Sequence, residues 1–283
     1  MISLWVAVIL SMMAVGLGHR LSMALRLSGY QKDKLKSLYQ AKSGLTLAIS
    51  GLESDDPSYD ALTDSWAQED EEGFIKVVDE ERKININTAS KELLTALLEE
   101  YSFSDIEARV NNILIWRGDI PDEAKIYEGL GYSSKGAVFT NCQELLLVKD
   151  FQLQDYQLLK DTITVYPGDK VNINTAAEDV LTILANSVAQ GAEQQNAVAS
   201  VVTGIINIRN DPNRGPFKDI AAAQIDAAPG SADESLFNNL KPKLTVASSY
   251  FTVESTGNAG KIKTRIEAVY NRAEKKTTYW HER

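Results

Sequence analysis

The chain has 283 residues, and its 39 Asp and Glu residues outnumber its 29 Lys and Arg residues, which gives a net charge of -10 at pH 7. Such a chain repels phosphate backbones, so nucleic acid is not the expected partner. The single cysteine, Cys142, excludes an intrachain disulfide and a cysteine-based zinc cluster, and the two histidines, His19 and His281, stand at opposite ends of the chain, which disfavours a histidine-centred active site.

The N-terminal segment at 2–18, ISLWVAVILSMMAVGLG, contains no charged residue and lies at the short end of the lengths that cross a bilayer as a helix. We expect residues 1–20 to be the transmembrane part of a helix. Its membrane and assembly residues are Leu4, Trp5, Val6, Val8, Ile9 and Leu10. A cleaved secretory signal would normally begin with a basic region, and none precedes Ile2.

The helical pattern continues beyond the apolar segment. Apolar residues recur at spacings of three and four through Leu35, Leu38, Ala41, Leu45, Ala48 and Leu52, and no proline occurs before Pro57. This predicts one helix that runs to about Leu52, with an amphipathic part at 21–55. An anchor followed by a separate helix is the alternative. The basic residues after the span would by themselves keep the body cytoplasmic, so charge leaves the orientation undecided. They are Arg20, Arg26, Lys32, Lys34 and Lys36.

Two β-rich segments flank the middle of the chain. Residues 56–82 form an acidic linker that ends in the predicted strand FIKVVDEER at 74–82. Residues 246–283 alternate apolar and polar residues over 250–256, 261–272 and 276–283, with turns expected at GNAG (257–260) and at 273–275. This predicts a three-stranded antiparallel meander. Such a sheet needs a helix across one face, which the N-terminal helix can supply.

The segment between them, residues 83–245, is built as a repeat. KININTASKELLTALL at 83–98 matches KVNINTAAEDVLTILA at 170–185. Each copy continues in the same way, since NNILIWRGD at 111–119 resembles TGIINIRND at 203–211, and FTNCQELLLV at 139–148 resembles FKDIAAAQI at 217–225. The matches predict two copies of one helical unit, inserted as an all-α domain.

The NINTA motif is typical of a helix start. We expect Asn87 or Thr88, and Asn174 or Thr175, to cap the helices that follow, with acids in each first turn near the positive end of the helix dipole. The following leucines then face the core. This structural role would account for the motif without a ligand.

The motif also resembles helix-hairpin-helix modules, in which a glycine-containing hairpin presents backbone amides to a phosphate. A membrane-anchored helix-hairpin-helix protein that binds or takes up DNA is therefore the alternative hypothesis. However, the link at 99–108 has no glycine and four acids, and the link at 186–197 has Gly191 alone. An anchored hydrolase is the third class, and the chain shows no nucleophile elbow, phosphate loop or catalytic histidine pair.

Four stretches carry a resemblance that covers nearly the whole chain: QAKSGLTLAISGL at 40–52, ININTASKELLTAL at 84–97, VNINTAAEDVL at 171–181 and LKPKLTVASSYFTV at 240–253. They resemble the K-type minor pseudopilin of type II secretion systems. The resemblance implies an α+β fold, in which a long N-terminal membrane helix packs on a small antiparallel pilin-like sheet. A large all-α insert of two helix-hairpin-helix-like repeats interrupts the sheet.

The resemblance also implies a function without catalysis. Such a subunit sits at the tip of a periplasmic pseudopilus with I- and J-type minor pseudopilins and the major pseudopilin. It spans the inner membrane once with its body in the periplasm, and it helps to initiate pseudopilus assembly and the export of folded proteins across the outer membrane. No nucleic acid is expected as a partner.

Two features of the family concern the N-terminus. Precursors begin with a basic leader that a prepilin peptidase removes before methylation, and this sequence starts at Met1 without one. Most pseudopilins carry a glutamate at mature position five that pairs with a neighbouring subunit, whereas K-type members resemble each other in lacking it. No acid occurs at 1–18 here, which suits a subunit with nothing above it.

Related proteins bind calcium in the helical domain. The candidate ligands here are Asp119, Asp122 and Glu123, hard oxygen donors close together in an expected loop. Asp211, Asn213 and Asp219 form a second set. No other cofactor is expected, and the sequence contains no complete calcium-loop pattern.

Overall fold

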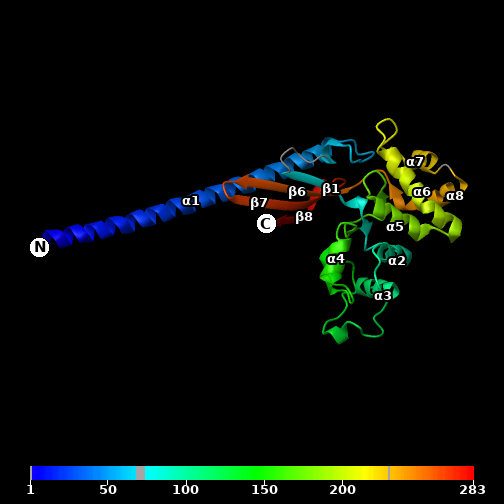
Figure 1. Cartoon of the computed structure of the whole chain (residues 1–283), viewed down its shortest axis with the longest axis horizontal. Helices are drawn as coiled ribbons and strands as arrows, with labels where there is room; N and C mark the ends of the chain where they lie inside the picture. The colour runs from blue at the N-terminus through cyan, green and yellow to red at the C-terminus, as the bar shows by residue number, and fades with distance from the viewer. Residues whose placement is uncertain (1, 68–73, 229) are drawn as a thin grey trace.

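The computed structural model describes residues 2–67, 74–228 and 230–283. Helix α1 (Ile2–Ser54) is unbroken, its N-terminal half projects from the body, and its C-terminal half lies against the body (Figure 1). The prediction of one helix from the apolar segment to about Leu52 is confirmed. Within the described residues, α1 is the one helix long and apolar enough to cross a membrane.

A four-stranded antiparallel sheet lies beside the second half of α1, with strand order β1-β6-β7-β8. The strands are β1 (Ile75–Asp79), β6 (Tyr250–Ala259), β7 (Ile262–Asn271) and β8 (Lys276–Glu282). The expected C-terminal meander is thus confirmed, and β1 adds an edge to it. The sheet face toward α1 packs a small core on the helix, built from Ala41, Leu45, Ala48, Leu52, Trp66, Val77, Phe251, Val253, Ile266, Ala268 and Tyr270. Leu35, which the helical pattern included, stays 56% exposed because it lies on the face of α1 opposite Asp33 and Ser37, the residues that approach the sheet.

Two boundaries differ from the predictions. The strand predicted over 74–82 ends at Asp79, because the Asp79 side chain accepts a hydrogen bond from the Glu81 amide and starts a 3-10 turn, η2 (Glu80–Arg82). The turn expected at 257–260 is shorter, because β6 continues through Ala259. Gly257 stays in the strand since its missing side chain lets the strand pass directly under α1, against Ser37.

The chain leaves the sheet after β1 and returns in the neighbouring strand β6, and a helical insert fills the interval. Its first repeat holds α2 (Lys91–Glu100), α3 (Ile106–Arg117) and α4 (Leu153–Leu159), and its second holds α5 (Glu178–Val188), α6 (Gly191–Arg209), α7 (Ile220–Ala227) and α8 (Ser231–Leu240). The insert lies at the end of the body away from the N-terminus of α1 (Figure 1). The expected α+β, pilin-like fold class is confirmed.

The insert is not purely helical. Each NINTA motif begins in a two-residue strand that pairs in parallel with the end of its own repeat: β2 (Ile84–Asn85) with β3 (Ile163–Thr164), and β4 (Val171–Asn172) with β5 (Leu244–Thr245). One apolar core runs through both repeats, and α2 packs on α5 between them. The insert therefore has a core separate from that of the sheet.

Candidate functional site

Both copies of the NINTA motif close the same turn. The Asn85 side-chain oxygen accepts a hydrogen bond from the Asn87 amide at 2.9 Å, and Asn172 accepts one from the Asn174 amide at 3.0 Å. The fifth residue of each motif then donates its amide to the first, since Ala89 N lies 2.9 Å from Asn85 O and Ala176 N lies 2.9 Å from Asn172 O. Side-chain and backbone hydrogen bonds thus hold the same turn closed, which makes the turn rigid.

The second asparagine of each motif binds a distant phenylalanine through both of its polar atoms. Asn87 Nδ2 donates to the Phe139 carbonyl at 2.9 Å, and Phe139 N donates to Asn87 Oδ1 at 2.7 Å. Asn174 makes the same pair with Phe217, at 2.8 and 2.9 Å. Both phenylalanines are buried. The amide thus ties each motif to the segment that completes its repeat.

An arginine at the end of the long helix completes each unit. Arg117 Nη1 donates to Ile86 O at 2.6 Å and to Ala89 O at 3.0 Å, and Arg209 Nη1 donates to the equivalent carbonyls of Ile173 and Ala176 at 2.9 and 2.6 Å. A buried guanidinium thereby satisfies carbonyls that the turn leaves without partners. Arg117 also pairs with Asp119, whereas Arg209 has no carboxylate partner among the described residues, and its burial lowers its pKa to about 10.

The predicted helix caps are wrong. Ser90 is the N-cap of α2, and its hydroxyl accepts from Leu93 N at 3.3 Å. Helix α5 follows Ala177, which has no side chain that could cap it. The side chains of Asn87 and Asn174 bond the backbones of Phe139 and Phe217 instead of a helix amide. Thr88 is exposed, and the Thr175 hydroxyl donates to Asp79 at 2.5 Å. Tertiary bonds therefore take the groups that local capping would have used.

The first set of calcium candidates is not brought together. Asp119 faces Arg117, Asp122 accepts the amides of Ile126 at 2.9 Å and Tyr127 at 3.3 Å, and Glu123 is exposed. These carboxylates organise the loop after α3 instead of meeting one another. Calcium binding by this chain stays a prediction.

The second set of candidates has local roles as well. Asp211 accepts the Asn213 amide at 2.9 Å, and Asp219 caps α7 by accepting the Ala222 amide at 2.7 Å. Each carboxylate satisfies a backbone amide close to it in sequence, as turn and N-cap residues commonly do.

A buried polar centre lies where the sheet meets the insert, and it begins with Asp79 at the end of β1. Asp79 is 2% exposed, and its Oδ2 accepts hydrogen bonds from Asn172 Nδ2 at 3.1 Å, Thr175 Oγ1 at 2.5 Å and Ser248 Oγ at 2.8 Å. Burial raises the pKa of Asp79 above its ordinary value. A single carboxylate thus joins β1, the second NINTA motif and the approach to β6.

The next two acids extend this centre to the other elements. Glu80 accepts the Thr164 hydroxyl at 2.7 Å and the Lys83 ammonium at 2.8 Å, which ties the first repeat to the sheet. Glu81 accepts the Ser249 amide at 2.7 Å, and its burial raises its pKa to about 7. We call Asp79, Glu80 and Glu81 the acidic junction. Its three side chains hold the two repeats and the returning strand.

A buried ion pair lies beside the acidic junction. Asp60, which is 0% exposed, accepts two bonds from the Arg272 guanidinium, at 2.8 and 2.6 Å, and one from the Ser248 amide at 2.7 Å. The guanidinium also packs 5.0 Å from the centre of the Phe251 ring. Burial raises the pKa of Asp60 to about 6 against the lowering effect of Arg272. This pair links the loop after α1 to the β7–β8 turn.

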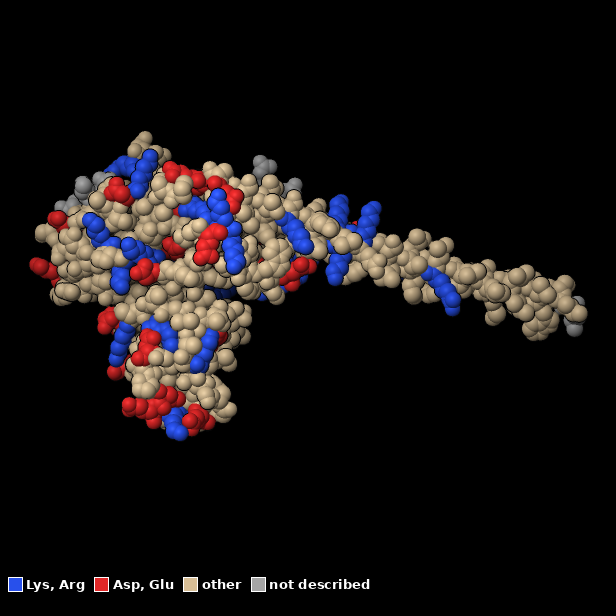
Figure 2. All heavy atoms as spheres, turned by 180° about the vertical axis from the view of Figure 1, so that it is seen from behind, with Lys and Arg blue, Asp and Glu red and all other residues tan. Residues whose placement is uncertain are grey.

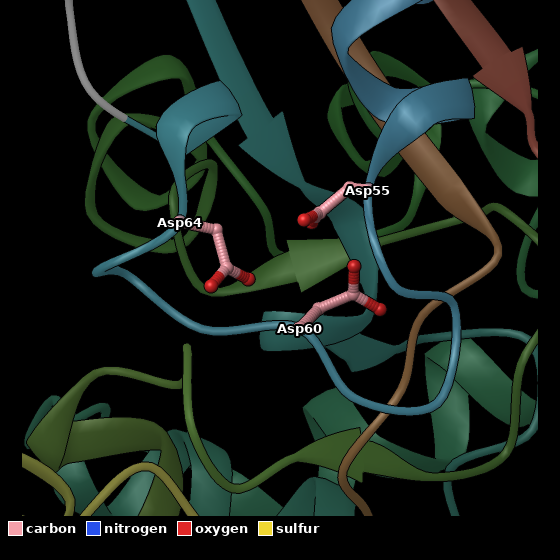
Figure 3. A group of neighbouring side chains, drawn as sticks. All are labelled: Asp55, Asp60 and Asp64. Carbon is pink, nitrogen blue, oxygen red and sulfur yellow. The ribbon is translucent and has the colours of Figure 1, made fainter.

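Asp55 and Asp64 approach Asp60 from the same loop, and oxygens of the three carboxylates lie within 4.8 Å of one another (Figure 3). Asp64 Oδ2 accepts the Ala61 amide at 2.7 Å, and burial raises its pKa. Arg272 already neutralises Asp60. Asp55 Oδ2, by contrast, is buried and has no hydrogen-bond partner among the described residues.

The predicted membrane residues lie on the free part of α1. Leu4, Trp5, Val6, Val8, Ile9 and Leu10 are between 43% and 70% exposed. No residue of α1 before Ser37 is buried. An apolar helix that packs on no other described residue of its chain is suited to lipid or to a partner helix.

The amino-acid sequence did not lead us to predict the acidic junction or the roles of Arg117 and Arg209. Arg117 and Arg209 had a signal, since WRGD and IRND align in the two repeats. The DEER run at 79–82 stands directly before the first motif and falls within the predicted strand at 74–82. A run of acids gives no signal of burial, because Asp and Glu are ordinarily exposed.

Comparison with known proteins shows which fold the chain shares. No protein-family model and no curated protein matches the chain. The structure is similar to a chain in the crystal structure of the GspK-GspI-GspJ complex from the type 2 secretion system of enterotoxigenic Escherichia coli. The TM-score is 0.69 at 17% identity, over 90% of this chain and 98% of that chain. The likeness therefore shows the fold, and it agrees with the resemblance found in the sequence.

Proposed function

We propose that this protein is a minor pseudopilin without catalytic activity, which occupies the tip of a type II secretion pseudopilus. The observation that carries the proposal is the shared fold over nearly the full length of a chain that was solved in complex with two further pseudopilus components. Its partners are then the I- and J-type minor pseudopilins and, below them, the major pseudopilin. Its body lies in the periplasm, and α1 anchors it in the inner membrane.

The position of the insert supports a place at the tip. The insert lies at the end of the body away from the membrane helix (Figure 1), where a subunit stacked above would have to sit. The apolar segment contains no acid in its first turn or elsewhere up to Gly18, so it lacks a carboxylate that could pair with such a subunit. The insert leaves no room for a subunit above, while the apolar part of α1 stays free to pack with subunits below. Such a subunit can begin a pseudopilus but cannot be added in its middle.

The acidic junction has a clear role in this proposal. In a tip subunit the distal insert is carried by α1 and the sheet, so the insert and the sheet must stay fixed to each other. Asp79 and Glu80 join both repeats to β1, and Asp60 joins the end of α1 to the sheet through Arg272. These buried charge-assisted hydrogen bonds are stronger than neutral ones.

The experiment is co-purification of the full chain in detergent with the I- and J-type minor pseudopilins of the same organism. We expect one complex that contains all three, whereas the DNA-binding alternative predicts retention of duplex DNA at about 150 mM salt and no such complex. Retention of DNA at this salt, or failure to form the complex, would reject the proposal. A mixture with the I- and J-type proteins from an unrelated system serves as the specificity control.

A further inference from the structure

The part of α1 between the apolar segment and the sheet is a bare, basic stretch of helix. Residues 19–36 carry Arg20, Arg26, Lys32, Lys34 and Lys36 but a single acid, Asp33. We call this stretch the basic stem. Within the described residues none of its five basic side chains forms an ion pair, and the first buried residue of α1 is Ser37. Its charge contrasts with the net charge of -10 on the whole chain.

The stem begins where the helix would leave the bilayer. At 1.5 Å per residue, Arg20 lies about 3 Å and Arg26 about 12 Å beyond Gly18. The intervening Leu21, Leu25 and Leu27 are more than half exposed and extend the apolar surface, so the bilayer boundary falls between Gly18 and Leu27. Both arginines then lie at the headgroup layer, which is about 5 to 8 Å thick on each side. Their long side chains can reach it from either end.

The sheet brings further positive charge to the end of the stem that joins the body. The β6–β7 turn lies beside the stem, because a Cβ at Gly260 would be 2.5 Å from the Asp33 carboxylate, and Ser37 Oγ lies 2.7 Å from Thr264 Oγ1. Lys261 and Lys263 in this hairpin are exposed. Basic side chains accordingly gather where the stem enters the body (Figure 2). The acid of the stem faces the hairpin, which leaves the basic groups to solvent.

We propose that the basic stem binds anionic phospholipid headgroups on the side of the membrane from which the body projects. The inference rests on the membrane anchorage in the proposed function. Its grounds are the charge complementarity and the continuity of the stem with the membrane segment. Arg20 and Arg26 donate paired hydrogen bonds to lipid phosphates. Lys32, Lys34 and Lys36 add attraction over the Debye length, which is about 8 Å at physiological salt. The contact fixes how deeply α1 sits in the bilayer.

The test uses the full chain in vesicles that contain brominated lipids, which quench a nearby tryptophan. Leu21→Trp places the probe beside Arg20, and Trp5→Phe removes the other tryptophan of the apolar segment. Quenching is compared between brominated phosphatidylglycerol and brominated phosphatidylcholine. We expect at least fivefold preference for the anionic lipid, since one basic residue at the surface contributes about fivefold. The preference should fall as salt is raised to about 0.5 M.

Two five-residue variants decide the question. In the stem variant R20Q/R26Q/K32Q/K34Q/K36Q the ratio of quenching by the anionic lipid to quenching by phosphatidylcholine should fall to about 1. The control variant K160Q/K241Q/K243Q/K275Q/K276Q removes as many exposed lysines from the body and should keep it. Equal quenching by both lipids, a preference that survives in the stem variant, or loss in the control variant would each overturn the inference. Flotation of the unmodified chain with vesicles tests anchorage, and complex formation with the I- and J-type proteins tests the proposed function separately.

Discussion

The strand β6 passes so close to α1 at Gly257 that a Cβ built there would lie 1.9 Å from the carbonyl oxygen of Ser37. This contact joins the membrane helix to the sheet at the point where the stem ends. Ser37 also bonds Thr264 in the next strand at 2.7 Å. A residue with no side chain is therefore required at 257.

We predict that Gly257→Ala lowers the free energy of unfolding by about 3 kcal/mol or more, because the obstructing atom belongs to the helix backbone and cannot rotate away. Gly51→Ala, at a helical position where a Cβ meets nothing within 4 Å, is the matched control. It should raise stability by about 0.5 to 1 kcal/mol, since alanine has the higher helix propensity. Urea unfolding followed by circular dichroism measures both. Similar effects of the two substitutions would contradict the close contact.

The asparagine bonds inside each repeat predict a second result. Asn174→Ala leaves the Phe217 amide and carbonyl without their partners in a buried site, which should cost about 2 to 5 kcal/mol. Asn213→Ala, whose side chain is exposed and bonds within its own turn, should change stability by less than about 0.5 kcal/mol. Unfolding curves compare them. A full-stability Asn174→Ala protein would show that the motif does not need this bond.

The acidic junction makes stability depend on pH. The pKa of Glu81 is about 7 in the folded protein and ordinarily 4.5, so the folded state binds more protons between these values. The free energy of unfolding should therefore fall as pH rises from about 4.5 to 7, by about 1 to 3 kcal/mol from this group.

Glu81→Gln keeps an oxygen acceptor for the Ser249 amide but cannot ionise. Between pH 5 and 7 the free energy of unfolding of this variant should change less than that of the unmodified protein. The difference should be the contribution of Glu81, about 1 to 3 kcal/mol. Unfolding measured in pH steps tests this. An unchanged pH profile would assign the dependence to another group.

The Asp60–Arg272 pair predicts strong coupling. Arg272→Gln leaves the carboxylate of Asp60, which is 0% exposed, without its cation, and this should cost about 3 to 5 kcal/mol at pH 8. The loss should shrink toward pH 5, because the folded pKa of Asp60 is about 6 and a protonated carboxyl needs no cation.

The double variant Asp60→Asn/Arg272→Gln provides the control. It removes both charges and should regain at least half of the loss at pH 8, since the penalty comes from one unpaired charge and not from the missing bond alone. Additive losses in the double variant would mean that the two side chains act independently.

The amino-acid sequence by itself determined the elements whose signals are local. The apolar and then amphipathic spacing of α1, the alternation in β6 to β8, and the duplication of NINTA can each be read within a short window, and the family resemblance gave them an order. The insert between neighbouring strands followed from that order. Predictions of the fold were accurate where one periodicity ran without interruption.

The tertiary structure decided what the polar residues do. Asn87, Thr88, Asn174 and Thr175 looked like helix caps because capping needs only neighbours, yet the actual partners of Asn174 and Thr175 lie 43 and 96 residues away. Asp60 meets Arg272 across 212 residues. Such pairs leave no periodic trace in a sequence, because a buried polar group bonds with whichever group the packing of distant elements brings to it.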